Sequence, residues 1–164
     1  MRGIQKIDLS VMSGKFEKPS KFTKLKEGVN KVRVLSDPYL YYVVGKPTAK
    51  GFVRSIIQEG VEIPEFLRDV EPKQTYGFII YNHGTKHFEV LETGSMLGVQ
   101  LVQLIQEKYP DEFKAHDIDI TAKGQKLTRT YEASYADKPT DLPKGLSKDS
   151  AEYRFVLSHF EGLR

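Results

Sequence analysis

The stretch from Gln74 to Tyr131 constrains the fold of this chain more than any other. It begins with QTYGFIIYNHGTKHFEVLE, in which two β-rich runs flank the turn-forming tetrapeptide NHGT, so it predicts a hairpin. An amphipathic segment, TGSMLGVQLVQLIQEKYP, follows, and DIDITAKGQKLTRTYEA then predicts a second hairpin that turns at KGQ. The order of hairpin, helix and hairpin indicates an antiparallel β domain interrupted by one helix.

Side-chain periodicity within this stretch predicts its buried positions. The helix has one apolar face, formed by Leu97, Leu101, Leu104 and Ile105. Thr93 or Ser95 is expected to cap it. In the second hairpin, alternation predicts that Ile118 and Ile120 point into the core. The polar residues expected to point outward are Asp117, Asp119 and Thr121. The phenylalanines assigned to the core are Phe78, Phe88 and Phe113.

Three more β-rich runs precede the stretch, at residues 28–36, 39–44 and 51–58. In the first run, Val32 and Val34 share one face of a half-buried strand. The other two form a long hairpin with the tip GKPTAKG. We therefore predict an all-β chain: a five-stranded oligonucleotide-binding (OB) barrel with a helix between strands 3 and 4, a long strand 2–3 hairpin region and a C-terminal helix.

The chain divides into three parts. Residues 1–27 form a basic, mostly irregular arm, in which Phe16 and Phe22 are expected to contact the domain. Residues 28–136 form the OB-fold domain. Residues 137–164 form a Pro-containing linker and a terminal helix, whose apolar side is predicted to carry Phe155, Val156 and Phe160.

Composition limits the function classes. The chain has no cysteine, which excludes disulfides and thiolate metal sites. It also has no apolar run long enough for a membrane span or a signal peptide, so we expect no membrane partner and a cytoplasmic location. Residues 1–60 carry 12 Lys or Arg against 5 Asp or Glu, whereas residues 61–164 carry 13 against 17. The basic part indicates either a surface for a polyanion or a solvated arm.

Signals for catalysis are thin. Asp117 and Asp119 have the spacing of a divalent-cation site on one strand face, but alternating acidic residues are far more often solvated. His83 and His87 flank a turn, and no further zinc ligands lie near them in the sequence. The chain has no Gly-rich phosphate loop and no nucleophile elbow. We predict a non-enzymatic protein with no metal and no cofactor.

Aromatic residues interleaved with cations on strands give a stronger signal. Single-stranded nucleic acid is held by base stacking on rings and by basic groups along its phosphates. The predicted phosphate contacts are Lys31, Arg33, Lys46, Lys50, Arg54 and Arg129. The predicted stacking residues are Tyr39, Tyr41, Tyr42, Tyr76 and Tyr131. Alternation requires that either Tyr41 or Tyr42 is exposed, and a register slip of one residue exchanges them.

Three segments resemble the single-stranded-DNA-binding proteins of tailed phages. EGVNKVRVLSDPY resembles their opening strand, Gly-x-Asn-x-x-Arg-(Ile/Val)-Leu. HFEVLETGSMLGVQLVQLIQE resembles the strand that runs into their barrel helix, and DIDITAKGQKLTRTYEAS resembles their closing hairpin. The resemblance covers roughly residues 22–143, in order. By position, Arg33 matches the family's strand arginine and Tyr131 its closing-hairpin tyrosine.

The resemblance implies an OB fold that sequesters single-stranded DNA during phage replication, recombination or repair, in the host cytoplasm. The implied partners are single-stranded DNA, further copies of the chain along the DNA, and replication or recombination proteins. The Cys/His zinc site of several relatives and their acidic C-terminal tail have no counterpart in this sequence. Two other functions stay open: an RNA-binding OB domain, and a non-enzymatic protein-interaction or assembly barrel.

Overall fold

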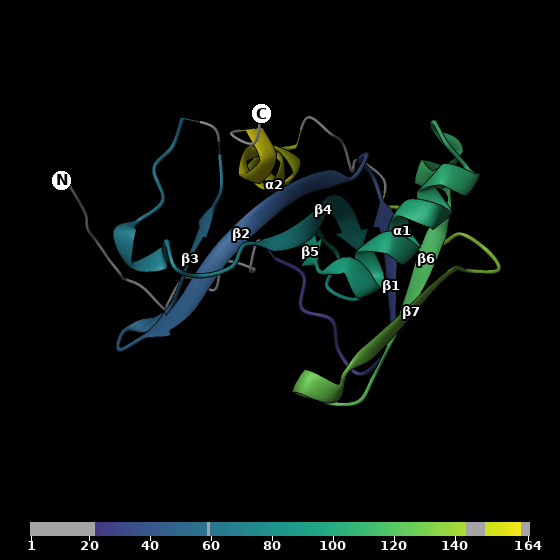
Figure 1. The fold of residues 1–164 in the computed structure, drawn as a ribbon. Helices are drawn as coiled ribbons and strands as arrows, with labels where there is room; N and C mark the ends of the chain where they lie inside the picture. Colours follow the sequence, from purple (N-terminus) through teal and green to yellow (C-terminus); the bar gives the residue numbers. More distant parts are fainter. Residues whose placement is uncertain (1–21, 59, 144–149, 162–164) are drawn as a thin grey trace, which may run out of the picture.

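Seven strands and two α-helices make up more than half of the part of the chain that the structure describes (Figure 1). The computed structural model describes residues 22–58, 60–143 and 150–161. The strands are β1 (Gly28–Val34), β2 (Tyr39–Thr48), β3 (Gly51–Ile56), β4 (Lys73–Asn82), β5 (His87–Thr93), β6 (Asp117–Lys123) and β7 (Thr130–Tyr135). The α-helices are α1 (Ser95–Glu107) and α2 (Ala151–Glu161), and the short 3-10 helices are η2 (Glu65–Leu67), η3 (Glu112–Ala115) and η4 (Lys126–Thr128).

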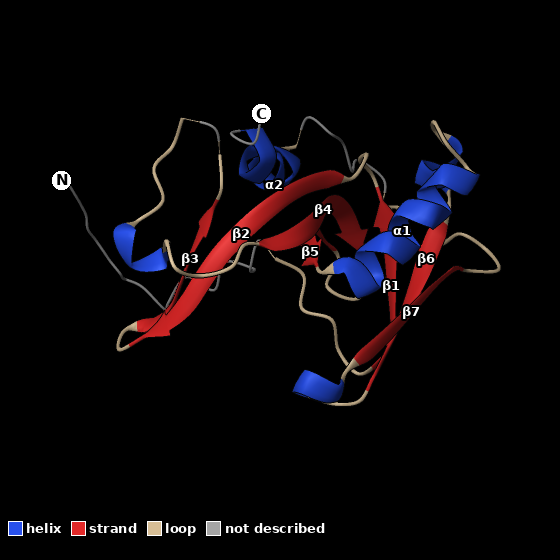
Figure 2. Ribbon diagram, viewed as in Figure 1, coloured by secondary structure: helices blue, strands red, loops and turns tan. Residues whose placement is uncertain are grey.

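The strands form one antiparallel sheet in the order β3-β2-β4-β1-β6-β7, and β5 pairs with the other edge of β4 (Figure 2). β4 pairs with three neighbouring strands. Its first half pairs with β2 from Lys73 to Gly77, its second half pairs with β1 from Ile80 to Asn82, and β5 runs along Tyr76 to Asn82. The prediction of a mostly-β chain is confirmed. The described strands form an open seven-stranded sheet, so a closed five-stranded barrel is not confirmed.

Both faces of β4 are covered, because α1 packs on one and α2 on the other. Phe78 and Ile80 belong to the cluster with α1, whereas Ile79 and Tyr81 belong to the cluster with α2. This alternation explains why six consecutive β4 residues are buried. The α1 cluster consists of Val32, Val34, Phe78, Ile80, Leu91, Leu97, Leu101, Ile105, Phe113, Ile118 and Ile120. The α2 cluster consists of Tyr41, Ile79, Tyr81, Phe88, Val90, Tyr153, Val156 and Phe160.

The predicted core positions are largely confirmed. The burial of Phe78, Phe88, Phe113, Ile118 and Ile120 follows the sequence pattern. The face of α1 is confirmed too, with Leu104 only partly buried.

Two helix predictions are wrong. Gly94 occupies the N-cap position of α1, so neither Thr93 nor Ser95 caps it. On the terminal helix, Val156 and Phe160 are buried as predicted, together with Tyr153, but Phe155 is 52% exposed because the period of α2 points it away from the sheet.

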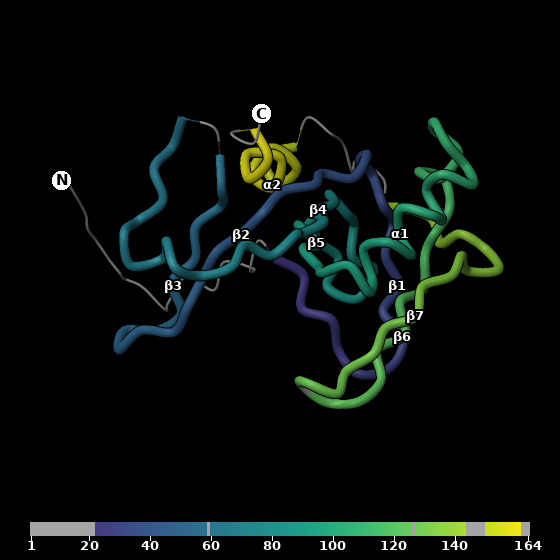
Figure 3. The backbone as a smooth tube through the Cα atoms, viewed as in Figure 1, coloured from purple at the N-terminus to yellow at the C-terminus, as the bar shows by residue number. Residues whose placement is uncertain are grey.

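The chain segment before β1 lies along the sheet (Figure 3). Phe22 forms a parallel bridge with Val90, and its ring meets the His159 ring edge-on at 5.0 Å. The contact predicted for Phe22 is therefore present, whereas Phe16 lies outside the described residues. Further along, the Leu25 carbonyl accepts a hydrogen bond from Arg129, so this segment reaches the β6–β7 hairpin. None of the described helices is long and apolar enough to cross a membrane.

Candidate nucleic-acid interface

The predicted contact residues divide between the two faces of the sheet. Strand alternation, read from the two core clusters, gives the face of each residue. On the α2 side lie Lys31, Arg33, Tyr39, Tyr41 and Arg54. On the α1 side lie Tyr42, Lys46, Tyr76 and Tyr131. Lys50 lies in the β2–β3 turn, and Arg129 lies between η4 and β7.

Helix α2 covers the tyrosines on its side of β2. Tyr39 stacks on Phe160 with ring centroids 4.1 Å apart and an interplanar angle of 3°. Tyr41 is only 6% exposed, and its hydroxyl donates a hydrogen bond to Glu92. Because the helix already occupies both rings, the prediction that Tyr39 and Tyr41 stack on bases does not fit this structure. Tyr42 is the exposed tyrosine of the pair that alternation left open.

Arg33 is committed to a buried ion pair. Its Nε atom lies 2.7 Å from Oδ1 of Asp117, its register partner on β6, and its Nη2 donates to the Thr140 carbonyl at 2.8 Å. The Thr140 amide and the His83 ring also contact this carboxylate. Burial alone would raise the pKa of Asp117, but these hydrogen bonds lower it below its ordinary value. The phosphate-binding role predicted for Arg33 does not fit this buried ion pair. Asp117 lies on the face opposite Ile118 and Ile120, as predicted, but it is buried where an outward-facing residue was expected.

Arg54 is likewise engaged on the α2 side. Its Nη1 and Nη2 atoms donate to the two carboxylate oxygens of Glu92 at 2.6 and 3.0 Å. Glu92 also contacts the hydroxyl of Tyr41 and Nε2 of His159. Burial opposes the charge of Glu92, but these partners lower its pKa to about 2. The charge of Arg54 is thus offset by a carboxylate that stays ionised at neutral pH.

The α1 side carries a set of accessible apolar and aromatic side chains on neighbouring elements, which we call the exposed stripe. It consists of Leu40, Tyr42, Tyr76, Met96, Val99 and Tyr131. Of these, the exposed fractions are 56% for Leu40, 47% for Tyr42, 53% for Met96 and 42% for Val99. Tyr76 and Tyr131 are half-buried against the core.

Contacts between neighbouring elements hold the exposed stripe together. Leu40 on β2 is the register partner of Tyr76 on β4, and the Tyr76 ring lies against Gly98 of α1. A Cβ atom at position 98 would lie 2.4 Å from that ring, so only glycine permits this approach. The Gln100 side chain donates to the Tyr131 carbonyl and accepts from the Ala133 amide, which fixes α1 to β7. The stripe thus crosses β2, β4, α1 and β7.

Cations lie at both ends of the exposed stripe. At the β2–β3 end are Lys50 and Lys46. The Nζ atom of Lys46 lies 3.7 Å from the exposed carboxylate of Asp69. At the β7 end, Lys123 and Tyr131 line a hollow of about 490 Å³, and Arg129 binds the carbonyls of Leu25 and Gly124. The first turn of α1, which faces the stripe through Met96, carries no acidic residue.

Sequence reasoning found three residues of the exposed stripe and missed the others. Tyr42, Tyr76 and Tyr131 were predicted as stacking residues. Leu40 was missed, although alternation with Tyr41 puts it on the face of Tyr42. Met96 and Val99 fall outside the apolar face of the helix, and only the docking of α1 between β4 and β7 shows their place in the row.

Three of the four side chains proposed for the two candidate metal sites, those of His83, His87 and Asp117, have other partners. His83 contacts Asp117 at 2.8 Å, and His87 contacts Glu152 at 2.9 Å. Asp119 is the register partner of Lys31, and its Oδ1 atom is buried without a hydrogen-bond partner. Within residues 22–58, 60–143 and 150–161, no three His, Asp or Glu side chains gather as a metal site would require.

Comparison of the chain with protein-family models, with curated proteins and with solved structures finds no match in any of the three.

Proposed function

We propose that this protein binds single-stranded DNA without sequence preference along the exposed stripe. The observation that supports this proposal is a row of exposed rings and apolar side chains with cations at both ends. Such a surface suits a flexible polyanion whose bases stack on aromatic faces while its phosphates follow basic groups. Tyr42, Tyr76 and Tyr131 are the stacking residues. The phosphate contacts are Lys46, Lys50, Lys123 and Arg129.

The proposed function is still that of an OB-type single-stranded-DNA-binding protein like those of tailed phages. The proposed binding surface, however, differs from the one predicted from the sequence. The α2 side, which carries Arg33, Tyr39 and Tyr41, is filled by α2 and by the segment around Thr140. On the α1 side, the exposed stripe remains accessible. The protein would act in replication, recombination or repair in the host cytoplasm, with several copies along one strand and with replication or recombination proteins as partners.

Tyrosine fluorescence tests the proposal directly, since the chain contains 9 tyrosines and no tryptophan. Addition of oligo-dT should quench the emission, and Tyr42→Ala should weaken binding about tenfold, as loss of one stacked base predicts. Tyr109→Ala is the matched control, because Tyr109 is 57% exposed but lies beyond the far end of α1. Equal effects of the two substitutions would remove the exposed stripe as the binding surface.

Two further outcomes separate the alternative functions. Competition between poly-dT and poly-U distinguishes a DNA-binding from an RNA-binding domain, because stacking on tyrosine tolerates either polymer. Unchanged emission together with no gel shift at low salt would contradict nucleic-acid binding. The exposed stripe would then be a protein-interaction surface.

A further inference from the structure

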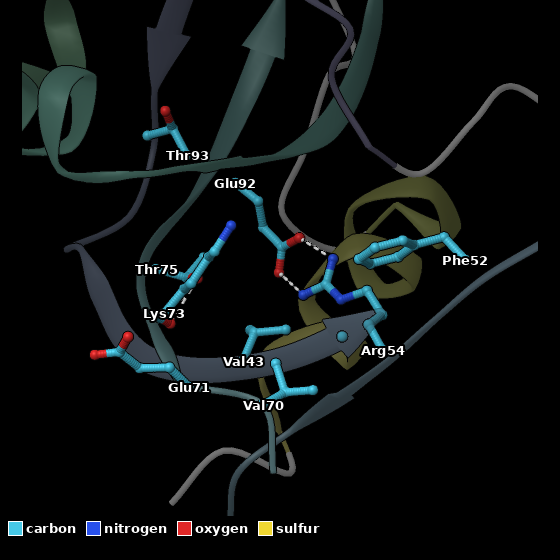
Figure 4. Close-up of a pocket in the computed structure, with 10 residues that line it drawn as sticks. Val43, Phe52, Arg54, Val70, Glu71, Lys73, Thr75, Glu92 and Thr93 are labelled. Atoms are coloured by element: carbon cyan, nitrogen blue, oxygen red, sulfur yellow. Dashed lines mark hydrogen bonds and ion pairs between the residues drawn. The ribbon is translucent and has the colours of Figure 1, made fainter. Parts of the chain in front are cut away.

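A second recess lies on the opposite side of the β2–β3 hairpin from the exposed stripe. We call it the hairpin pocket (Figure 4). Its volume is about 260 Å³. Its lining residues are Val43, Gly45, Phe52, Arg54, Val70, Glu71, Lys73, Thr75, Glu92 and Thr93. Sites for drug-sized ligands measure roughly 300–1,000 Å³, so this one has room for a single small ligand.

Phe52 forms an aromatic wall of the hairpin pocket. Phe52 is 68% exposed although it sits in a β-strand. Its ring lies over Gly45 on the neighbouring strand, where a Cβ atom would come within 2.6 Å of the ring. The missing side chain lets the ring lie close to the β2 backbone, and the 68% exposure of Phe52 leaves ring surface available for stacking. Val43 and Val70 add apolar surface.

The polar groups of the hairpin pocket leave one cation available. Arg54 is held by both oxygens of Glu92, so the two charges offset each other. Lys73 forms no ion pair among the described residues, and in Figure 4 its ammonium group points into the space beside Glu92 and Thr93. The Glu71 carboxylate lies at the rim and points away from that space. The pocket thus combines an exposed ring with one ammonium group that has no ion pair among the described residues, and Thr75 and Thr93 complete its lining.

We propose that the hairpin pocket binds a single nucleotide, with its base on Phe52 and its phosphate on Lys73. The choice of a nucleotide rests on the proposed function. A planar base suits the exposed ring and a phosphate suits the ammonium group. The Thr75 hydroxyl donates to the Lys73 carbonyl at 3.4 Å and can still accept a hydrogen bond from the base. Its place on the far side of β2 from Tyr42 makes it a site for a strand terminus or a free nucleotide, separate from the exposed stripe.

Titration of the full ¹⁵N-labelled chain with thymidine 5′-monophosphate, followed by NMR, tests this site. The nucleotide should shift the amide signals of Phe52, Lys73 and Thr75 saturably, and inorganic phosphate or thymidine alone should bind more weakly. Phe52→Ala and Lys73→Gln should each weaken nucleotide binding about tenfold. Both residues are exposed, so both variants should retain the native spectrum. The matched controls, Phe66→Ala and Lys138→Gln, change an exposed ring and an exposed lysine outside the pocket and should leave binding unchanged.

Three results would overturn the proposal: no shift in the pocket signals, equal binding of inorganic phosphate and the nucleotide, or equal losses in the variants and their controls. Binding of N-acetylphenylalanine as tightly as the nucleotide would overturn it as well, in favour of a protein C-terminus with an aromatic residue. These failures are distinct from failure of the proposed function. Oligo-dT binding that depends on Tyr42 would persist without a nucleotide in the hairpin pocket.

Discussion

The Arg33 guanidinium and the Asp117 carboxylate have side-chain exposures of only 8% and 0%. Removing one partner of such a pair leaves an uncompensated buried charge, which costs far more than the loss of a surface pair. Asp117→Asn should therefore lower the free energy of unfolding by about 3 kcal/mol or more. Asp111→Asn is the matched control, because its carboxylate is 84% exposed and lies 3.6 Å from Lys114. That change should cost less than about 1 kcal/mol.

Urea unfolding of the two variants measures the difference. Similar small losses in both would show that the buried pair contributes little to stability, and that Arg33 is free to rearrange toward a ligand.

The pair of Arg33 and Asp117 also shows what the pattern of residues in the sequence leaves undetermined. Alternation predicted the inward turn of Ile118 and Ile120, which is confirmed. Alternation also put Asp117 on the opposite face, as observed, but it does not reveal that the segment around Thr140 covers that face.

At the scale of single elements, the approach of α1 to β4 depends on Gly98. In a helix interior, Gly→Ala ordinarily stabilises by about 1 kcal/mol. Here the added methyl group would lie 2.4 Å from the Tyr76 ring, close to the root of that side chain, so Tyr76 or the helix must shift. Gly98→Ala should therefore destabilise the protein by roughly 1–3 kcal/mol, as overpacking does. It should also weaken oligo-dT binding, because Tyr76 belongs to the exposed stripe.

Gln103→Ala provides the comparison, since Gln103 is exposed in the same helix and its replacement should be neutral or slightly stabilising. A stabilising Gly98→Ala would mean that α1 does not pack on Tyr76 as described.

Glu92 joins β2, β3, β5 and α2, because it contacts Tyr41, Arg54 and His159. Its pKa is lowered to about 2 in the folded protein, from an ordinary value of 4.5. The Glu92 carboxylate therefore binds a proton more tightly in the unfolded chain than in the folded one. Its contribution to the free energy of unfolding is fully present above the ordinary pKa of 4.5 and is lost as the pH falls toward 2. Unfolding free energies at pH 7 and pH 3 should differ less in Glu92→Gln than in the wild type. An identical pH dependence in both would contradict this role.

The helices themselves could be predicted from the sequence better than the strands against which they pack. The apolar face of α1 follows from its spacing, and a terminal helix follows from residues 150–161. Nothing in the local pattern of β2 shows that α2 returns to stack Phe160 on Tyr39. The choice between Tyr41 and Tyr42 as the exposed ring therefore depended on a helix distant in sequence.

For the whole molecule, the number of strands around β4 was the least predictable feature. Alternation identifies a strand and its faces, but it does not state how many neighbours share its edges. β4 is divided between β2 and β1 on one edge and pairs with β5 on the other, which yields an open sheet where a five-stranded barrel was predicted. The candidate site changed for the same reason, since the faces covered by α1 and α2 decide which rings stay accessible.

Because cations lie at both ends of the exposed stripe, the salt dependence of DNA binding tests whether a strand occupies the whole stripe. A strand that crosses it contacts cations at both ends, and each neutralised phosphate contributes about −0.7 to the slope of log K against log salt. Lys50→Gln and Lys123→Gln lie at opposite ends and should each reduce the steepness by about 0.7, with additive effects in the double variant. Lys138→Gln is the control, because Lys138 is exposed in the segment that follows β7. If only one of the two end variants changes the slope, the strand occupies only that end of the stripe, and salt-independent binding would contradict an electrostatic contribution altogether.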